Sequence, residues 1–262
     1  MPEGDTVWQA ARRLAALTGQ ELVASDFRVP SLATSDVSGA EVLETLSRGK
    51  HLLTRLSTRL SGGLTVHTHL GMDGAWVVRP VGTRWQRPAH QARVVLRTAT
   101  HEAVGFSVQV ELVRTAEEER FVGHLGPDLL GPDWDADEAV RRLRRAPDAP
   151  VGEALLEQRN LAGVGNVYKC ELCFLAGVDP RTPVRSVPDL GRLVDQAHRL
   201  LVTNRDRVER VTTGDRRRGR QLWVYGRRGP CLRCGTPIRR ASVGSGARER
   251  PTYWCPTCQP MR

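Results

Sequence analysis

Lysine and long apolar runs are almost missing from this sequence. Only Lys50 and Lys169 are lysines among its 39 basic residues, and aromatic residues make up 5% of the chain. No apolar run approaches the ~18 residues of a membrane span, and no signal-peptide pattern opens the chain. These absences exclude membrane-spanning classes and predict a soluble intracellular protein with no membrane partner. The preference for arginine over lysine is typical of a GC-rich genome.

The charge has one dominant sign. The net charge is +10 at pH 7, with a pI of about 10.1. Arginine forms bidentate contacts with phosphate, and neutralising phosphates makes binding depend on salt. We therefore expect a polyanionic partner. The alternative is a charge that serves solubility alone.

The first half of the chain has the pattern of a β-sandwich preceded by a helix. The 262 residues are enough for two modules or one large domain. Asp5 is a candidate N-cap, and apolar residues then recur at helical spacing until Gly19. Short runs with β character follow, separated by turn residues. The expected strands are 21–29, 51–56, 64–70, 75–78, 92–96 and 108–113.

Beyond the break at Gly131 and Pro132 the pattern becomes helical. Apolar residues at i, i+3 and i+4 spacing predict helices over 137–145, 151–158, 164–176 and 187–203. An arginine-rich loop, 215–220, then leads to a tail that contains cysteines. The predicted class is α+β, with a sandwich domain over 1–130, a helical domain over 135–225 and a hairpin domain over 226–262.

Four of the six cysteines form two C-x-x-C pairs in the tail, Cys231 with Cys234 and Cys255 with Cys258. This spacing is typical of a zinc ribbon, in which four thiolates close a tetrahedral structural site. We expect one structural Zn²⁺ that holds a hairpin and does no chemistry. Cys170 and Cys173 lie in an apolar helical stretch without a second pair, so we interpret them as buried small hydrophobes.

The chain starts Met1-Pro2-Glu3, which offers a secondary amine beside a carboxylate if Met1 is removed. An α-amine titrates near pH ~8 and a lysine near ~10.4, so far more of the former is neutral at pH 7. A neutral amine can attack carbon and continue to an iminium. The positive end of the following helix disfavours an ammonium by up to about 1 kcal/mol. A chance proline after the initiator is the alternative.

Several other segments are candidates for phosphate binding. The turn from Gly163 through Gly165 and Asn166 to Tyr168 joins two helices, and it permits close approach to backbone N–H groups. A simple helix-breaking turn is the alternative. Lys50 stands at the start of a predicted strand. Met72 lies in a tight loop after His67 and His69, where it could act as a wedge in a base stack. The two histidines have no third ligand nearby, so we expect them to pack or form hydrogen bonds.

Taken together, these motifs resemble those of the formamidopyrimidine-DNA glycosylase / endonuclease VIII family. The resemblance rests on Met1-Pro-Glu-Gly4, Arg48-Gly-Lys-His-Leu-Leu53, Gly163-Val-Gly-Asn-Val-Tyr168, Val224-Tyr-Gly-Arg227 and Arg250 ahead of the last cysteine pair. The motifs occur in the family's order along nearly the whole chain. The first one resembles the endonuclease VIII branch.

The resemblance implies a bifunctional DNA glycosylase and abasic-site lyase with a helix-two-turn-helix module. Pro2 would attack C1′ of a damaged deoxynucleotide, and Glu3 would transfer protons at the sugar. The resulting Schiff base would cleave the strand by β,δ-elimination. Lys50, Asn166 and Arg250 match the family's phosphate contacts, and the resemblance also places Lys50 and Arg250 among the catalytic residues with Pro2 and Glu3. The partner would be damaged DNA, bound by a monomer associated with the nucleoid in a bacterial cytoplasm.

The departures from the family bear on the substrate. No Asp-Pro-Arg-Arg-Phe-Gly loop occurs near Phe106, so an 8-oxoguanine specialist is disfavoured and oxidised pyrimidines are expected. Met72 is the one bulky residue of the expected wedge loop. Two other interpretations of the function remain. The protein is a relative that acts mainly on pre-formed abasic sites, or it is a non-catalytic zinc-ribbon protein that binds DNA.

Overall fold

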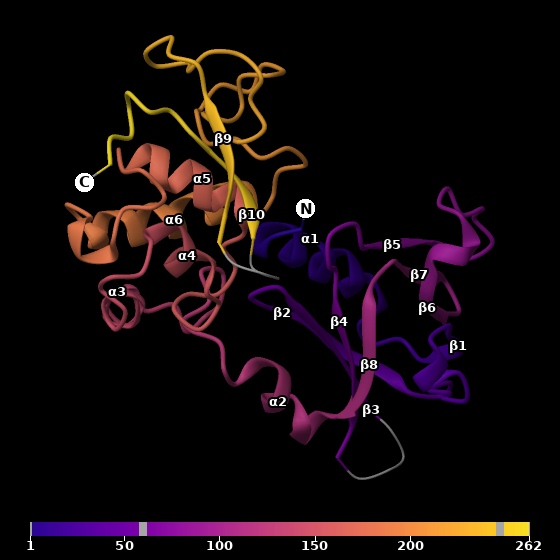
Figure 1. Ribbon diagram of the computed structural model, residues 1–262. Coiled ribbons are helices and arrows are strands. Elements are labelled where there is room, and N and C mark those ends of the chain that lie inside the picture. The colour runs from indigo at the N-terminus through magenta and orange to yellow at the C-terminus, as the bar shows by residue number, and fades with distance from the viewer. Residues whose placement is uncertain (1, 58–61, 245–248, 262) are drawn as a thin grey trace. The chain divides into compact units, whose positions relative to one another are not determined.

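A computed structural model describes residues 2–57, 62–244 and 249–261 of the chain. The chain divides into two compact units, residues 1–124 and residues 125–262. Unit 1 contains two β-sheets and a leading helix, whereas unit 2 is helical and ends in a two-stranded hairpin (Figure 1). The predicted α+β class is confirmed.

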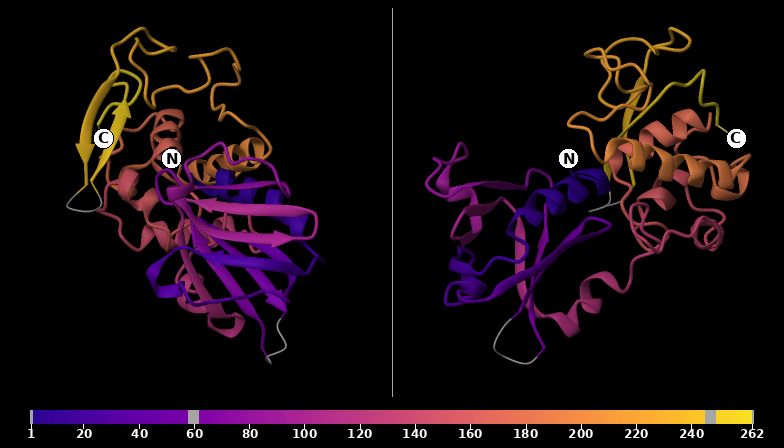
Figure 2. Two further views of the ribbon diagram at one scale, coloured as in Figure 1. Left: turned by 90° about the vertical axis from the view of Figure 1, so that its right-hand side faces the viewer. Right: turned by 180° about the vertical axis from the view of Figure 1, so that it is seen from behind.

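Unit 1 consists of two four-stranded antiparallel sheets. One sheet has the order β1-β6-β7-β5 and the other the order β2-β3-β4-β8. Figure 2 shows their strands from two further sides. The elements are α1 (Gly4–Leu14), β1 (Leu22–Phe27), β2 (Glu41–Arg48), β3 (His51–Ser57), β4 (Leu64–His69), β5 (Ala75–Pro80), β6 (Ala92–Thr98), β7 (His101–Phe106), β8 (Gln109–Arg114) and α2 (Glu119–Val122). Short 3₁₀ turns span Ala15–Leu17, Pro30–Leu32, Ala89–Gln91 and Thr115–Glu117.

Helix α1 packs one apolar face against β2, β3 and β5. Val7, Ala10 and Leu14 on that face are buried, as their helical spacing predicts. The N-cap is Glu3, whose carbonyl accepts the N–H groups of Thr6 and Val7 at 2.9 and 3.0 Å. The expectation that Asp5 caps the helix is therefore wrong. Asp5 lies in the first turn, which places the helix start one residue after the Pro2-Glu3 pair.

Six of the eight strands of unit 1 fall on the predicted apolar runs, but β2 and β7 were missed. Strand β2 has charged residues within it, and Glu44 pairs across the sheet with Arg55 of β3 through a 2.7 Å ion pair. In β7, Glu102 is buried against Arg97 of β6 and accepts a 2.7 Å hydrogen bond from Trp85. Cross-strand partners satisfy these charges, so charged residues do not prevent strand formation. In β7 a short apolar run, 103–106, follows Glu102 and is buried, so this strand had a local signal that the prediction overlooked.

Unit 2 has four longer helices around one core and a two-stranded hairpin. They are α3 (Ala136–Arg144), α4 (Val151–Leu156), α5 (Asn166–Leu175), α6 (Leu190–Asn204), β9 (Arg239–Val243) and β10 (Arg250–Trp254), with a 3₁₀ turn at Val184–Ser186. Asp135 and Asp189 cap α3 and α6 through side-chain hydrogen bonds to backbone N–H groups. Within the described ranges, no helix is both long and apolar enough to cross a membrane.

The hairpin of unit 2 packs on α5. A small core joins Cys170 and Phe174 of α5 to Cys231 and Cys255 of the tail. Cys170 and Cys173 are fully buried, which confirms their interpretation as small hydrophobes, and burial raises the pKa of the Cys173 thiol. This shared core holds the cysteine-bearing tail against the helix that begins at Asn166.

Candidate functional site

The start of the chain places a proline directly before a buried carboxylate. Pro2 is half-buried and stands two residues before α1, while the side chain of Glu3 has no exposed surface. The backbone of Glu3 is extended, with φ of −129° and ψ of −176°, and helical geometry starts at Gly4. The pair therefore lies at the positive end of the helix dipole, which favours a neutral amine over an ammonium.

Lys50 lies in a tight turn at one end of the sheet that contains β3. Gly49, with φ of +57°, permits this two-residue connection from β2 to β3. His51 pairs across the sheet with His69, the last residue of β4. The charge of Lys50 contributes to a lowered pKa at His69, after the larger effect of burial. The structure thus brings Lys50 to the same end of the sheet as the loop that follows His69.

That loop carries Met72, whose side chain is 60% exposed. The N–H of Gly71 donates to His69 Nδ1 at 3.1 Å, and the N–H of Gly74 donates to the carbonyl of Leu70 at 2.8 Å, so the loop is closed at its base. An exposed thioether on a closed loop is an apolar group presented to solvent. This is the geometry that a wedge needs.

Arg87 contacts the Met72 loop and was not found from the sequence. Its Nη1 donates to the carbonyl of Asp73 at 3.2 Å, and its guanidinium lies 6.0 Å from the ring centre of Phe106. Strand β7 ends at Phe106 and β8 begins at Gln109, so the connection between them is too short to carry a wedge of its own. No sequence pattern distinguishes Arg87 from the other arginines.

Histidines cluster beneath this end of the sheet. His51 Nδ1 and His67 Nε2 share a 2.9 Å hydrogen bond, and the two rings stack with centres 5.2 Å apart. The rings of His69 and His124 lie 5.3 and 6.4 Å from that of His51. Burial lowers the pKa of His51 to about 3 and that of His67 to about 4. The imidazoles of His51 and His67 are therefore neutral at pH 7, and burial also lowers the pKa of His69. This agrees with a packing and hydrogen-bonding role for His67 and His69.

In unit 2 the glycine turn ends at the first residue of α5. Gly163 adopts φ of +109°, and Gly165 is the N-cap of the helix. Asn166 is 2% exposed and donates from Nδ2 to the carbonyl of Pro251 at 2.8 Å. Its Oδ1 is buried without a hydrogen-bond partner among the described residues. The buried Asn166 amide thus keeps an unpaired acceptor, and through Nδ2 it links α5 to the strand that carries Arg250.

Tyr168 does not share this role. Its ring is fully buried in the core of unit 2. The guanidinium of Arg210 lies 5.3 Å from its centre. A ring without exposed surface supports the helix. Residues 163–166 of the same turn are also buried, so the DNA contacts predicted for this segment, Tyr168 included, stay predictions.

An arginine-rich loop in unit 2 is closed at both ends by one buried carboxylate. Glu171 of α5 accepts the hydroxyl of Thr212, and it accepts the N–H groups of Trp223, Val224 and Tyr225 at 2.8, 2.9 and 2.8 Å. Burial raises the pKa of Glu171, against four hydrogen bonds that favour its charged form. Arg216 and Arg218 on this loop are exposed to solvent.

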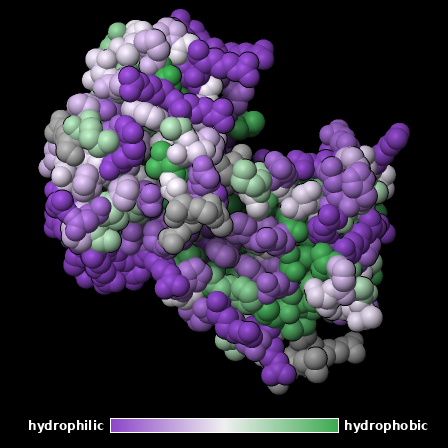
Figure 3. Space-filling view, viewed as in Figure 1, coloured by the Kyte–Doolittle hydropathy of each residue, from purple (hydrophilic) through white to green (hydrophobic). Residues whose placement is uncertain are grey.

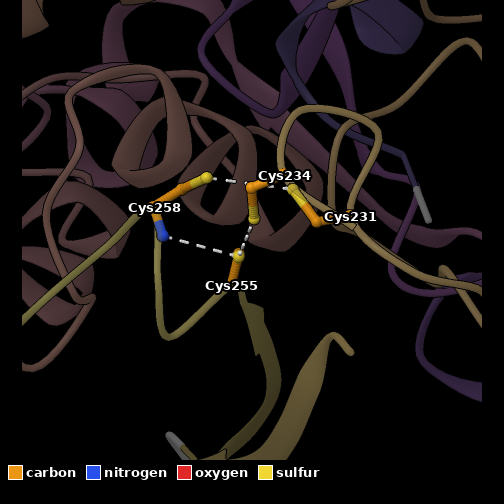
Figure 4. A group of neighbouring side chains, drawn as sticks. All are labelled: Cys231, Cys234, Cys255 and Cys258. Carbon is orange, nitrogen blue, oxygen red and sulfur yellow. Dashed lines mark hydrogen bonds between the residues drawn. The ribbon is translucent and has the colours of Figure 1, made fainter. Parts of the chain in front are cut away.

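The four tail cysteines converge on one point. Their sulfur atoms all lie within 4.8 Å of one another, and among the described residues theirs is the one group of three or more His, Cys, Asp or Glu side chains so arranged (Figure 4). The Cys231–Cys258 and Cys234–Cys255 sulfur pairs are 3.9 and 3.5 Å apart. A tetrahedron of thiolates around Zn²⁺ has sulfurs about 3.8 Å apart, from Zn–S bonds of about 2.3 Å. The site has the donors and the size for zinc.

Hydrogen bonds to sulfur support this cluster. The N–H of Arg233 points to Cys231 Sγ at 3.4 Å, and the N–H of Cys258 points to Cys255 Sγ at 3.5 Å. Hydrogen bonds with the side chain and the backbone of Thr236 lower the pKa of Cys234 to about 6. Such donors orient thiolate ligands around a metal.

The predicted site residues fall into two groups. Unit 1 holds Pro2, Glu3, Lys50 and Met72, and unit 2 holds Gly163, Gly165, Asn166, Arg250 and the four cysteines. Within unit 1, Lys50 and the Met72 loop share one end of a sheet. Within unit 2, the Asn166–Pro251 hydrogen bond joins the glycine turn to β10. In each unit, residues that can donate hydrogen bonds are held in place by helices and strands.

Three family matches cover most of the chain. Residues 1–115 match the formamidopyrimidine-DNA glycosylase N-terminal domain, and residues 125–206 match the formamidopyrimidine-DNA glycosylase H2TH domain. Residues 229–260 match the zinc finger found in FPG and IleRS. The matches follow the chain in the order of its sheets, helices and cysteine hairpin.

Relatives match along nearly the full length. The chain is 61% identical to "Probable endonuclease 8 2" of Streptomyces coelicolor, covering 99% of this chain and 94% of the relative. It is 50% identical to the "DNA-(apurinic or apyrimidinic site) lyase Nei2" of Mycolicibacterium smegmatis, over 99% of both chains. A Lactococcus lactis Fpg (MutM) structure, in complex with N7-benzyl-Fapy-dG DNA, shares the fold with a TM-score of 0.80. It is 22% identical and covers 99% of this chain and 100% of that one.

These matches define the class as DNA glycosylases and abasic-site lyases of base-excision repair. The chain belongs to the formamidopyrimidine-DNA glycosylase / endonuclease VIII family, on its endonuclease VIII-like branch.

Proposed function

We propose that this chain excises oxidised bases from DNA, mainly pyrimidines, and cleaves the strand at the resulting abasic site. The observation that carries the proposal is the half-buried Pro2 next to the fully buried Glu3 at the start of α1. The pairing supplies a secondary amine and an acid at one end of a helix dipole. One relative is itself named a DNA-(apurinic or apyrimidinic site) lyase.

In the proposed reaction, the neutral Pro2 amine attacks C1′ of the damaged nucleotide after Met1 has been removed. The C1′–base bond breaks as the N–C1′ bond forms, and the proton that the Pro2 nitrogen loses goes to the departing base. Glu3 protonates the sugar ring oxygen, and the bond between C1′ and that oxygen breaks so that the ring opens. The product is an iminium between Pro2 and C1′. This electron sink acidifies the C2′ protons and drives β-elimination and then δ-elimination of the two phosphates.

DNA is held by groups from both units in this proposal. Lys50 and Arg250 contribute charge, and Asn166 contributes an amide, at phosphates around the extruded nucleotide. Gly163 and Gly165 leave room for the backbone to approach. Extrusion of a base costs a few kcal/mol, less when the base is damaged. Met72, exposed on its closed loop, fills part of the gap that the base leaves.

One Zn²⁺ bound by Cys231, Cys234, Cys255 and Cys258 completes the proposed protein. The ion would stabilise the hairpin by closing a four-thiolate site. The hairpin strand β10 carries Arg250, so the metal contributes to DNA binding through the fold. The proposed domains are 1–130, 135–225 and 226–262. The protein would act as a monomer with the nucleoid in the cytoplasm of a bacterium with a GC-rich genome.

Trapping with borohydride tests the nucleophile. Reduction of the iminium should link the wild-type protein covalently to duplex DNA that contains an oxidised pyrimidine or an abasic site. Pro2→Gly keeps an α-amine but alters its geometry and basicity, and the trap should fall strongly. No trap with the wild type, or an undiminished trap with Pro2→Gly, would contradict the assignment.

A second function, action mainly on pre-formed abasic sites, is favoured by one observation. The β7–β8 connection is only two residues long, so Met72 lacks a companion wedge from that turn. Excision rates on intact lesions and on abasic DNA separate the two functions. A ratio strongly in favour of abasic DNA would support the lyase alone, whereas binding without any strand cleavage would indicate a non-catalytic DNA-binding protein.

A further inference from the structure

Two side chains on one face of the first turn of α5 form hydrogen bonds with β10. Asn166 Nδ2 donates to the carbonyl of Pro251 at 2.8 Å, and Lys169 Nζ donates to the hydroxyl of Thr252 at 2.6 Å. The two helix residues are three apart, a spacing that places both on the same side of a helix. The segment immediately after Arg250 is therefore fixed to the helix at two successive residues.

A hydrogen-bond relay continues from Lys169 to Arg250 itself. The Thr252 hydroxyl accepts from Lys169 and donates to the carbonyl of Arg250 at 3.1 Å. A hydroxyl has one proton and two lone pairs, so it can serve both contacts at once. The relay constrains the peptide unit that follows Arg250, where strand β10 begins.

The burial of this relay is costly. Lys169 is 2% exposed and Thr252 is 1% exposed. An amino group of this kind loses its hydration when it is buried, and hydrogen bonds must replace that hydration. Where packing alone is needed, an apolar side chain is often as stable or more stable. Lys169 is also one of only two lysines in a chain that otherwise uses arginine. These facts favour a role in placement over a role in packing.

We propose that Lys169 is a positioning residue for Arg250. Through Thr252 it holds the Arg250 backbone, and so it fixes the position from which the guanidinium, whose Nη1 donates to the carbonyl of Glu249 at 2.8 Å, reaches a phosphate. The binding gain comes from preorganisation, because the ordering cost is met during folding and not during association. The inference rests on the proposed role of Arg250 in DNA binding.

The test is a double-mutant cycle with Arg250. Lys169→Met removes the amino group, and Thr252→Val removes the hydroxyl at nearly constant volume. Thr252→Ser restores the hydroxyl. Ser242→Ala is the matched control, because Ser242 is an exposed hydroxyl residue opposite Pro251 on the neighbouring strand. Each variant is made with Arg250 present and with Arg250→Ala. Affinity for a duplex containing a tetrahydrofuran abasic-site analogue is measured by fluorescence anisotropy at several salt concentrations.

With Arg250 present, Lys169→Met and Thr252→Val should each weaken binding about fivefold to tenfold, a coupling of the size seen within one side-chain network. Thr252→Ser and Ser242→Ala should bind like the wild type. With Arg250→Ala, neither Lys169→Met nor Thr252→Val should weaken binding by more than about twofold, because the group that they position is gone. The cleavage rate at saturating abasic DNA should stay within about twofold of wild type when Arg250 is present.

Three results would overturn the inference. These are wild-type affinity in Lys169→Met and Thr252→Val, an equal loss in the Arg250→Ala background, and failure of Thr252→Ser to restore binding. Zinc content and the unfolding temperature verify that each variant is folded, and Thr252→Val carries the test alone if Lys169→Met does not fold. If the wild type neither binds nor cleaves abasic DNA, the proposed function fails instead, and that outcome is seen before any variant is compared.

Discussion

The two units of this chain differ sharply in charge. Unit 1 contains 14 basic and 13 acidic residues, whereas unit 2 contains 25 basic and 16 acidic residues, so their net charges are +1 and +9. On the face in Figure 3, hydrophobic residues gather over the strands of unit 1, and hydrophilic residues cover much of unit 2. Unit 1, which is nearly neutral, holds the proposed nucleophile and acid. Unit 2 holds most of the net positive charge that would attract a polyanion.

This division has a physical reason. A neutral secondary amine is the reactive form, and the positive end of α1 favours that form without any accumulation of arginines around it. Attraction to a phosphate backbone instead requires accumulated positive charge, which acts over about 10 Å at ordinary salt. Because the nucleophile and most of the positive charge lie in different units, the reactivity of the amine and the affinity for DNA can change independently. Pro2 and Glu3 at the start of α1 in unit 1 fit the first task, and the arginine loop and hairpin of unit 2 fit the second.

The largest effect on activity should come from Glu3→Gln, which removes the proposed acid of unit 1 and changes no residue of unit 2. Loss of a positioned acid should slow base release from intact lesions by about 10² to 10⁴-fold. Affinity for DNA should stay near wild type, because the phosphate contacts are unchanged. Single-turnover excision and anisotropy binding measure the two quantities. Unchanged turnover would remove Glu3 from the mechanism.

The second-largest effect should come from removal of the zinc, which should lower both the order of the hairpin in unit 2 and the affinity for DNA. Cys231→Ser or a chelator should release about one zinc per chain and disorder the hairpin, because a four-thiolate site stabilises its fold directly. DNA affinity should fall by at least about tenfold through loss of the Arg250 strand. Metal analysis, circular dichroism and anisotropy provide the measurements. Cys173→Ser is the matched control, since that thiol lies outside the cluster. Full affinity in zinc-free protein would refute the structural role.

Salt dependence sharpens the charge comparison. Lys50→Gln in unit 1 and Arg250→Gln in unit 2 should each reduce the slope of log affinity against log salt by about 1, as expected for one lost phosphate contact. Arg13→Gln changes the charge of unit 1 equally, on the exposed side of α1, and should leave the slope unchanged. A slope altered equally by all three would mean that net charge alone drives binding.

Acid should weaken unit 1 by a smaller amount. Burial lowers the pKa of His51 to about 3 and of His67 to about 4, whereas an unfolded histidine titrates near 6.5. The unfolded state therefore binds more protons at mildly acid pH, so the stabilisation is full above pH 6.5 and is lost as pH falls towards 4. The loss between pH 7 and pH 5 should be on the order of 1 to 2 kcal/mol for each histidine.

Urea unfolding at a series of pH values measures this loss. His67→Gln should flatten the decline of the free energy of unfolding with falling pH, and His90→Gln, an exposed histidine, should not. An identical pH dependence in wild type and His67→Gln would show that the buried cluster does not titrate in this way.

The sequence was most informative where local patterns determine structure. The spacing of Val7, Ala10 and Leu14 predicted α1, and the paired C-x-x-C motifs predicted a cluster that the structure confirms as four converging cysteines. Both depend on residues close in sequence or on strict ligand chemistry. The helices of unit 2 were predicted to within a few residues at most ends for the same reason.

Elements that depend on distant partners were missed. Strand β2 carries Glu44, whose charge hid the strand from a search for apolar runs, and its partner Arg55 lies on the next strand of the same hairpin. Tyr168 directly follows the glycine turn, and this position suggested that its side chain contacts a ligand. In the structure the ring lies on the buried face of α5, inside the core. The buried contact of Lys169 with Thr252 joins residues 83 positions apart. Rarity of lysine was the only sequence signal at Lys169, and it did not reveal the partner.

The central claim is that the chemistry resides on the amine of Pro2. The direct measurement is to trap the protein on abasic DNA with borohydride, digest the adduct and locate the modified residue by mass spectrometry. The account predicts a deoxyribose remnant on the peptide that begins at Pro2, with Met1 absent. A remnant on Lys50 or Lys169, or a trapped protein that retains Met1, would contradict it.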